Sequence, residues 1–416
     1  MAPRSSRELT LAALHEWRTG DRFADAILAQ LLRSSDLTTP DRAFTTELFY
    51  GILRNLTLLD FWIGSLRSQH LDQSARDLLR LGLYQLFLLE TPEHAAVYET
   101  VELAGKRTRS LVNAVLRTAL RRKEELLEKA SQQDLPVRSS HPRFLIDRWK
   151  ERFGADNTTA LCEWNNRPAP IYARINRLKI SVAEFLSQHS GAEQLPRYEN
   201  FVRLTGIPND ALAAGQCYVQ DPSTAAACLL LDPVPGEKVL DACAAPGGKT
   251  GYLAELMKNQ GAIVACDRDE GRIRTLEDNL ERLGVAIARF ARHDWTSSEP
   301  GPDIAASAPF DRILVDAPCS NTGVMRRRVD LRWRLKAKDF PKMGDEQFRI
   351  LGATIPLLKT GGVLVYSTCS IELEENEAVV ETITREFPFL KLVEQLSLLP
   401  FRDEFDGAFG AKLIRG

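Results

Sequence analysis

The chain of 416 residues lacks several patterns that would assign it to a familiar class. None of its seven cysteines forms a C-x-x-C pair, which argues against a zinc site or a disulfide framework and predicts free thiols. No apolar run approaches the ~18 residues that a membrane-spanning helix needs, and no apolar segment follows the first ten residues as it would in a signal peptide. We therefore expect a globular protein of the reducing cytoplasm, with no metal site and no membrane contact.

A large excess of charge of one sign is also missing. The net charge is −2, and 44% hydrophobic with 26% charged residues is an ordinary globular composition. Overall charge therefore does not indicate a nucleic-acid binder, and any such surface has to be a local patch. The length exceeds that of one typical core and predicts two or three domains.

The apolar periodicity changes along the chain and divides it into three predicted domains. Residues 1–130 show helical spacing throughout, with Leu78–Leu89 apolar almost all round, and predict an all-α bundle whose last long helix covers Val101–Arg122. The polar stretch 123–140 reads as a helix end followed by a linker. Residues 138–218 mix strand-like and helix-like segments and predict a small α/β unit.

From residue 219 to 416, short apolar strands alternate with helices. The strands are expected around 238–240, 263–266, 312–315 and 362–366. This alternation predicts an α/β domain with a mostly parallel sheet that helices cover on both faces.

A glycine-rich turn after the first of these strands predicts a ligand site. Its Gly247-Gly248 pair permits a close backbone approach, but Cys243 stands where a phosphate loop needs glycine, and the dinucleotide pattern G-x-G-x-x-G is absent. Asp267 ends the next strand, where an acid can accept hydrogen bonds from a ribose diol. The predicted cofactor site comprises Cys243, Ala244, Ala245, Pro246, Gly247, Gly248, Lys249, Asp267, Asp294 and Asp316.

Two cysteines follow two other strand ends, in Asp316-Ala317-Pro318-Cys319-Ser320 and in Ser367-Thr368-Cys369-Ser370. If those strands are neighbours, both thiols face the cofactor cleft. Methylation of cytosine carbon 5 needs a thiolate that adds to carbon 6, an acid near N3 and a group that assists release, and Cys369, Asp316 and Cys319 can supply these. The remaining cysteines are expected to be packing residues.

These motifs resemble the RNA cytosine-5 methyltransferase family, and within it the bacterial 16S ribosomal RNA enzymes of the RsmB (Sun, Fmu) type. The resemblance covers nearly the whole chain and also includes Gln220-Asp221-Pro222-Ser223 and Gly410–Ile414. It implies a Rossmann-like class I methyltransferase domain, S-adenosyl-L-methionine as cofactor, Cys369 as nucleophile and Cys319 as the release residue.

The helical half resembles the NusB RNA-binding fold, in residues 47–54 and 110–117. This implies a 16S rRNA target, usually cytosine 967 in the standard rRNA numbering, in naked rRNA or in an early assembly intermediate of the small subunit. We expect a monomer. The chain departs from its relatives at Arg328-Val329, where His-Pro is common, and at Trp295, where a small residue is usual.

Two local basic patches are candidate RNA contacts. Residues 100–152 hold 13 Lys and Arg against 7 Asp and Glu, and a second basic stretch follows Cys319. Cations bind phosphates, and an interleaved Trp can stack on a base. The predicted RNA-binding residues are Arg326, Arg327, Arg328, Arg332, Trp333 and Arg334.

Two other functions remain open from the sequence. The same chemistry on tRNA would need the same cysteines, so the choice of rRNA rests on the helical domain. A NusB-like assembly factor with an inactive methyltransferase half would bind rRNA without methylating it.

Overall fold

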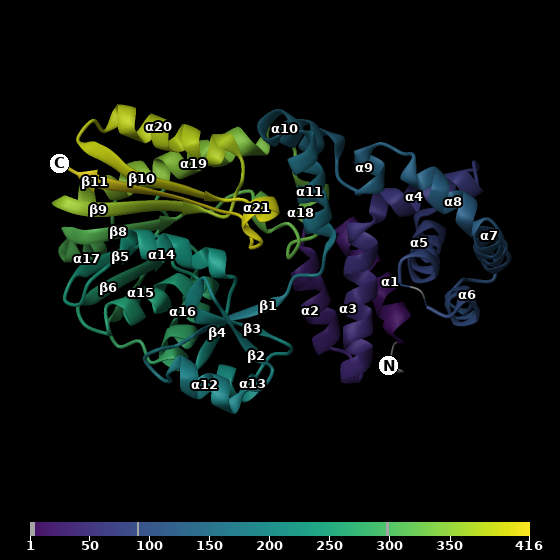
Figure 1. Cartoon of the computed structure of the whole chain (residues 1–416), viewed down its shortest axis with the longest axis horizontal. Coiled ribbons are helices and arrows are strands. Elements are labelled where there is room, and N and C mark those ends of the chain that lie inside the picture. The colour runs from purple at the N-terminus through teal and green to yellow at the C-terminus, as the bar shows by residue number, and fades with distance from the viewer. Residues whose placement is uncertain (1–4, 90, 297–298) are drawn as a thin grey trace. The chain divides into compact units, whose positions relative to one another are not determined.

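The computed structural model describes residues 5–89, 91–296 and 299–416 and divides into two compact units (Figure 1). The first unit comprises Met1–Arg167 and Met325–Leu335, and the second comprises Pro168–Val324 and Lys336–Gly416. The chain thus leaves the second unit after Val324 and returns to it at Lys336. The boundary at residues 167 and 168 divides the predicted second domain, 138–218, between the two units, and residues 325–335 of the predicted third domain belong to the first unit.

The first unit is helical, as predicted. The central helix is α5, in which every residue from Asp77 to Phe87 is buried, in agreement with the nearly all-apolar pattern there. The helices of this unit are α1 (Ser6–Thr19), α2 (Ala24–Arg33), α3 (Thr39–Arg54), α4 (Leu56–Leu66), α5 (Gln73–Phe87), α6 (Glu93–Glu102), α7 (Arg109–Arg121), α8 (Lys123–Ser131), α9 (Leu135–Arg138), α10 (Arg143–Phe153), α11 (Ala155–Asn166) and α18 (Leu331–Arg334).

Two predictions for this unit are wrong. The expected helix Val101–Arg122 is interrupted after α6 by a turn, in which Thr108 N–H donates to the Gly105 carbonyl, because glycine is a poor helix former. The stretch 123–140 is not a linker but forms α8 and α9. The indole of Trp62 donates to the Leu126 carbonyl at 3.0 Å, so α8 packs on α4 and its polar residues cover the outer face.

The small sheet of the second unit is antiparallel, in the order β2-β3-β1-β4. Strands β1 and β3 confirm that the stretch 138–218 contains strands, whereas β2 and β4 are too short to show a sequence pattern. The elements are β1 (Ile171–Ile175), α12 (Val182–Gln188), β2 (Ala192–Leu195), β3 (Tyr198–Leu204), α13 (Asn209–Ala213) and β4 (Cys217–Val219).

The large sheet has the order β10-β11-β9-β8-β5-β6-β7, and β11 alone among its strands runs against the rest. The expected mostly parallel sheet is therefore confirmed. Its strands are β5 (Lys238–Asp241), β6 (Ala262–Asp267), β7 (Ala288–Arg292), β8 (Phe310–Asp316), β9 (Leu358–Thr368), β10 (Leu390–Leu398) and β11 (Ala408–Arg415).

Helices cover both faces of the large sheet (Figure 1). Ile313 of β8 belongs to the core beneath α19 and α20, and the next residue, Leu314, belongs to the core beneath α14 and α15. The helices are α14 (Ala225–Leu231), α15 (Gly248–Leu256), α16 (Glu270–Leu283), α17 (Pro302–Ser307), α19 (Asp339–Thr354), α20 (Glu377–Glu386) and α21 (Pro400–Asp403), with short 3₁₀ turns η1 (Pro222–Thr224), η2 (Thr322–Val324), η3 (Ile355–Leu357) and η4 (Leu373–Glu375).

A buried arginine joins the two sheets of the second unit. Arg174 of β1 donates to the Gly248 carbonyl at 2.6 Å and pairs with Glu255 at 2.9 Å, so the small sheet is held against both ends of α15. None of the described helices has the length and apolarity to span a bilayer.

Candidate active site

Parallel strands bring the predicted site residues to one edge of the large sheet. Asp267 ends β6, Asp316 ends β8 and Thr368 ends β9, and carboxyl ends of parallel strands meet at the same edge. Strands β8 and β9 are direct neighbours: Asp316 pairs with Ser367, whose carbonyl accepts from Ala317 N–H at 2.9 Å. The two strands that precede the cysteines are therefore neighbours, as the prediction that both thiols face one cleft requires.

The two cysteines that follow these strands are in contact. Cys319 Sγ lies 3.2 Å from Cys369 Sγ, and Gly323 N–H donates to the Cys369 carbonyl at 3.0 Å. Cys369 is half-buried and Cys319 is buried. The hydrogen bond with Cys369, together with burial, raises the pKa of the Cys319 thiol well above its usual value, so Cys319 is held in its protonated form at neutral pH.

A buried carboxylate, Glu375, supports both cysteine loops and was missed from the sequence. It accepts from Ser320 N–H and from the Ser370 hydroxyl, each at 2.7 Å, and from the Gln347 amide at 3.1 Å. Burial raises the pKa of Glu375, although the hydrogen bonds from these donors act to lower it. Glu375 lies in an acidic run typical of a solvated surface, and the one hint in the sequence is that a serine directly follows each cysteine.

The Gly247-Gly248 turn is shaped by packing. Gly247 has a left-handed φ of 103°, and a Cβ atom there would lie 2.9 Å from the Leu276 side chain. At Gly248 a Cβ atom would lie 2.8 Å from the Tyr218 ring. The glycines thus allow α16 and β4 to approach the turn closely, and the approach of a ligand to this turn stays a prediction.

Lys249, directly after this turn, reaches the cysteine loop. Its Nζ lies 2.6 Å from Asp316 Oδ2, so the predicted cofactor and catalytic residues share one ion pair. Arg272 makes a similar link: it donates to the Ala245 carbonyl at 2.7 Å and lies 3.4 Å from Asp267. These contacts hold the turn, β6 and β8 in one site.

Asp294 lies just after β7, beside this site. The Thr296 hydroxyl and backbone N–H donate to its carboxylate at 2.7 and 3.0 Å and lower its pKa, which keeps the carboxylate charged. The neighbouring departure, Trp295, is buried, and its indole donates to the Ala242 carbonyl at 2.8 Å. Trp295 thus holds the backbone at Ala242, where the cofactor turn begins after β5.

The basic stretch that follows Cys319 folds into the first unit. Arg332 is completely buried, where its guanidinium donates to the Asn166 side chain at 2.7 Å and to the Asn165 carbonyl at 3.1 Å. Burial lowers the pKa of Arg332 to about 9. A side chain so enclosed does not reach a phosphate, which corrects the prediction that Arg332 contacts RNA.

Other predicted RNA contacts are also engaged inside the first unit. Arg326 is buried and its guanidinium lies 3.9 Å from the centre of the Trp164 ring. The indole of Trp333 donates to a backbone carbonyl of α3 at 2.9 Å, and Arg334 donates to Asp330 at 3.0 Å. These contacts give Arg326, Trp333 and Arg334 partners inside the first unit, so their presence in the sequence does not require a contact with RNA.

Arg328 retains the exposure expected of an RNA contact. Its side chain is 46% exposed, and the carboxylate of Asp25 lies 3.9 Å away. Arg327 is half-buried. The adjoining departure, Val329, is buried in the core of the helical unit, so this dipeptide combines an apolar anchor with an exposed cation.

Comparison with known proteins identifies the family. The model "16S rRNA methyltransferase RsmB/F" matches residues 228–414, the NusB family model matches 4–121, and the RsmF/B-like ferredoxin-like domain matches 141–195. A probable ribosomal RNA small subunit methyltransferase B of Bacillus subtilis is 33% identical over 93% of this chain and 90% of its own length. The chain belongs to the RsmB/F methyltransferase family.

Other relatives of this methyltransferase agree. Ribosomal RNA small subunit methyltransferase B of Escherichia coli K12 is 38% identical over 90% of this chain and 91% of its own length. The crystal structure of a methyltransferase homolog from Pyrococcus horikoshii has a TM-score of 0.59 and 31% identity, and covers 68% of this chain and 97% of the other. The predicted combination of a NusB-like bundle, a small ferredoxin-like unit and a Rossmann-like methyltransferase domain is confirmed.

S-adenosyl-L-methionine is the cofactor of this methyltransferase, as predicted, and the site suits it. Carboxylates of Asp267, Asp294 and Asp316 stand near the strand ends where α/β folds bind ligands. Asp241, at the end of β5, has a different part. It is buried, accepts from the Thr250 hydroxyl at 2.7 Å, and burial raises its pKa to about 7.

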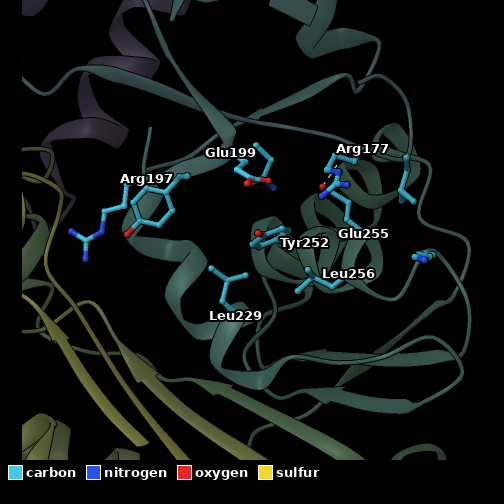
Figure 2. Close-up of a pocket in the computed structure, with 11 residues that line it drawn as sticks. Arg177, Arg197, Glu199, Leu229, Tyr252, Glu255 and Leu256 are labelled. Carbon is cyan, nitrogen blue, oxygen red and sulfur yellow. Dashed lines mark hydrogen bonds between the residues drawn. The ribbon is translucent and has the colours of Figure 1, made fainter. Parts of the chain in front are cut away.

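A cavity of about 620 Å³ lies elsewhere in the methyltransferase unit (Figure 2). Tyr252 and Glu255 of α15 line it, and Figure 2 shows Glu255 beside Arg177, whose backbone N–H donates to it at 3.4 Å. Neither cysteine nor any residue of the cofactor turn is among its lining residues. It is therefore separate from the site described above.

Proposed function

We propose that this enzyme transfers a methyl group from S-adenosyl-L-methionine to carbon 5 of one cytosine in 16S rRNA, by resemblance cytosine 967. The observation that carries the proposal is the pair of thiols, Cys319 and Cys369, 3.2 Å apart at the edge where the cofactor turn lies. When the target atom is itself a nucleophilic oxygen or nitrogen, methyl transfer does not require a thiol to activate it. Carbon 5 of cytosine is a poor nucleophile and does need covalent activation.

In this proposal Cys369 adds to carbon 6 of the cytosine, which makes carbon 5 electron-rich. Carbon 5 then takes the methyl group and its proton passes to solvent. The electron pair of that carbon–hydrogen bond re-forms the carbon 5–carbon 6 double bond, and Cys369 leaves as a thiolate. The release step is assigned to Cys319, whose sulfur lies beside that of the nucleophile. The target base has to leave its stack or be unpaired, because the thiols lie at a strand edge that a paired base cannot reach.

Asp316 is the proposed partner of cytosine N3. Its ion pair with Lys249 places the ammonium nitrogen 2.6 Å from the carboxylate oxygen, so this pair can support a hydrogen bond or a proton at N3. Addition of the thiolate to carbon 6 places negative charge on the ring, and a proton at N3 neutralises it. The cofactor supplies the methyl group as an electrophilic sulfonium.

The proposed substrate is naked 16S rRNA or an early assembly intermediate of the small subunit, and the proposed enzyme is a monomer that acts in the cytoplasm. The match of residues 4–121 to the NusB family favours rRNA over tRNA. The relatives named above are also ribosomal RNA small subunit methyltransferases. Exposed Arg328 and half-buried Arg327 remain the proposed phosphate contacts of the stretch after Cys319.

Bisulfite sequencing of 16S rRNA tests the proposal. Wild-type protein with S-adenosyl-L-methionine should protect one cytosine, Cys369→Ala should protect none, and Cys319→Ala should accumulate a covalent protein–RNA adduct. Cys217→Ala, which removes a buried thiol of β4, is the matched control and should behave like wild type.

Three other results would overturn parts of the proposal. Protection in tRNA instead of rRNA would leave the chemistry and refute the substrate. Tight rRNA binding with no methyl transfer would favour an assembly factor. An adduct with Cys369→Ala instead of Cys319→Ala would reverse the two cysteine roles.

A further inference from the structure

Asn321 lies between the two cysteine loops in an uncommon backbone conformation. Its φ is +58°, in the left-handed region that most side chains avoid and that Asn tolerates better than others. Its side-chain Nδ2 donates to the Cys319 carbonyl at 2.8 Å, and its Oδ1 lies 3.1 Å from Cys369 Sγ. The residue therefore contacts both loops at the thiols themselves.

These contacts fix the direction of every hydrogen bond in the cluster. Turning the Asn321 amide over would place its oxygen against the Cys319 carbonyl oxygen, so Oδ1 has to face Cys369. An amide oxygen only accepts, and a thiol has one hydrogen, so Cys369 donates to Asn321. The Cys319 thiol must then donate to Cys369 Sγ, which gives a chain from Cys319 through Cys369 to Asn321.

The charged groups around Cys369 act in opposite directions. The ammonium of Lys249 attracts a thiolate at Cys369 and is itself paired with Asp316, and the Cys319 thiol can donate to that thiolate. Glu375 acts on Cys319 from the opposite side of the loops. The Asn321 oxygen faces Cys369 with a partial negative charge, and it loses its hydrogen bond when the thiol ionises.

We propose that Asn321 is a positioning residue that holds Cys369 as a neutral thiol in the RNA-free enzyme. The inference deepens the proposed function, in which Cys369 is the nucleophile. The Cys369–Asn321 hydrogen bond has to break before Cys369 attacks carbon 6, because a thiolate has no hydrogen to donate. Asn321 thus keeps the hydrogen of the Cys369 thiol engaged until a substrate base displaces the amide.

Alkylation of Cys369 in the RNA-free protein tests this without methyl transfer. Iodoacetamide reacts with thiolates, and peptide mass mapping separates Cys369 from Cys319, so the rate at Cys369 is measured between about pH 6 and 10. Asn321→Gly keeps the left-handed backbone and removes the acceptor, so water can solvate the thiolate. We expect Cys369 to react about 3- to 10-fold faster near pH 7, with its profile moved to lower pH.

A second variant predicts the opposite sign. Asn321→Asp places a negative charge against Cys369, so alkylation should become slower and its profile should move to higher pH. Asn259→Gly is the control, because Asn259 also has a left-handed φ, of +57°, and lies away from the cysteines. It should leave the profile unchanged.

The outcomes separate this inference from the proposed function. Unmoved profiles, or shifts in the same direction for Asn321→Gly and Asn321→Asp, would overturn the role of Asn321. Opposite shifts together with no methylation of any RNA by the wild type would support Asn321 and refute the proposed function.

Discussion

Nζ of Lys249 lies 2.6 Å from Oδ2 of Asp316, and this ion pair connects the turn after β5 with the cysteine loop after β8. Burial opposes the charge on Lys249, but the attraction of Asp316 outweighs it, and the pKa of Lys249 is raised. The ammonium therefore persists at neutral pH beside Asp316. A lysine in a -Gly-Gly-Lys-Thr- context serves here as the partner of a carboxylate and not as a phosphate ligand.

Removing this ammonium should slow methyl transfer without unfolding the protein. We expect Lys249→Met to reduce the single-turnover rate by about 10²- to 10⁴-fold, because Asp316 loses its proton-bearing partner. Transfer of a labelled methyl group to 16S rRNA measures the rate. Lys258→Met, which removes an exposed lysine just after α15, is the matched control, and an equal loss in both variants would contradict a specific role for Lys249.

The brace beneath the cysteine loops predicts a loss of stability. In the wild type, Ser320 and Ser370 donate hydrogen bonds to the Glu375 carboxylate. Glu375→Gln turns an amide N–H₂ group toward donors, which should lower the free energy of unfolding by about 1–3 kcal/mol and lower the midpoint of thermal unfolding. Glu381→Gln makes the same chemical change at an exposed position of α20 and should leave the midpoint unchanged. A thermal melt of the two variants that gave the same midpoint would show that Glu375 does not support the loops.

The buried carboxyl of Asp241 predicts a pH dependence of stability. The unfolded chain ionises this group near pH ~4 and the folded protein near pH 7, because burial raises its pKa. The folded state therefore binds more protons between these values, and its stability falls as the pH rises from about 4 to 7. Asp241→Asn has no such proton and should lose less stability over that range, by at most about 4 kcal/mol.

Urea unfolding of the cofactor-free protein at about pH 5 and pH 8 measures this difference. Asp311→Asn is the control and should keep the wild-type pH dependence between about pH 5 and pH 8. Hydrogen bonds from Lys238 and Lys359 lower the pKa of Asp311, so its contribution is present above the unfolded pKa and lost as the pH falls. A wild-type protein and an Asp241→Asn variant with the same pH dependence would refute the assignment.

Two arginines of one segment should have different effects. Arg332→Met should destabilise the protein, by about 1–3 kcal/mol for each buried acceptor that loses its partner, because Arg332 is enclosed by α11. Arg328→Ala should change stability by less than about 0.5 kcal/mol, since its side chain is exposed, and should weaken RNA binding and reduce its salt dependence by about one ion. Unfolding and filter-binding measurements on both variants test this. An unstable Arg328→Ala variant, or an Arg332→Met variant that is stable and binds RNA weakly, would contradict the prediction.

Much of the fold was predictable because its patterns are local. Apolar strands around 238–240 and 312–315, each followed by a turn and a helix, indicate a parallel sheet wherever they occur. Strands β10 and β11 were missed. β10 lies at an edge of the sheet, is largely exposed and lacks a continuous apolar run. The helix break at Gly105 was missed because the apolar spacing continues across it.

The spacing of the motifs predicted which thiols meet, but it did not predict which side chains are buried. Cys319 and Cys369 were expected to meet because each follows a strand end, and neighbouring parallel strands bring them within 3.2 Å. Arg332 was expected at RNA because a basic run usually faces solvent. Val329, three residues earlier, packs into the helical core, and Arg332 is buried as well.

The sequence by itself determined the fold class, the family, the cofactor and the two thiols, since each depends on residue types at short, fixed spacings. Only the tertiary structure decided that Glu375 braces both loops, that Arg332 is an internal tie, and that Asn321 faces Cys369. Those three side chains owe their roles to contacts with residues 48 to 192 positions away, and such contacts form only when the chain is folded.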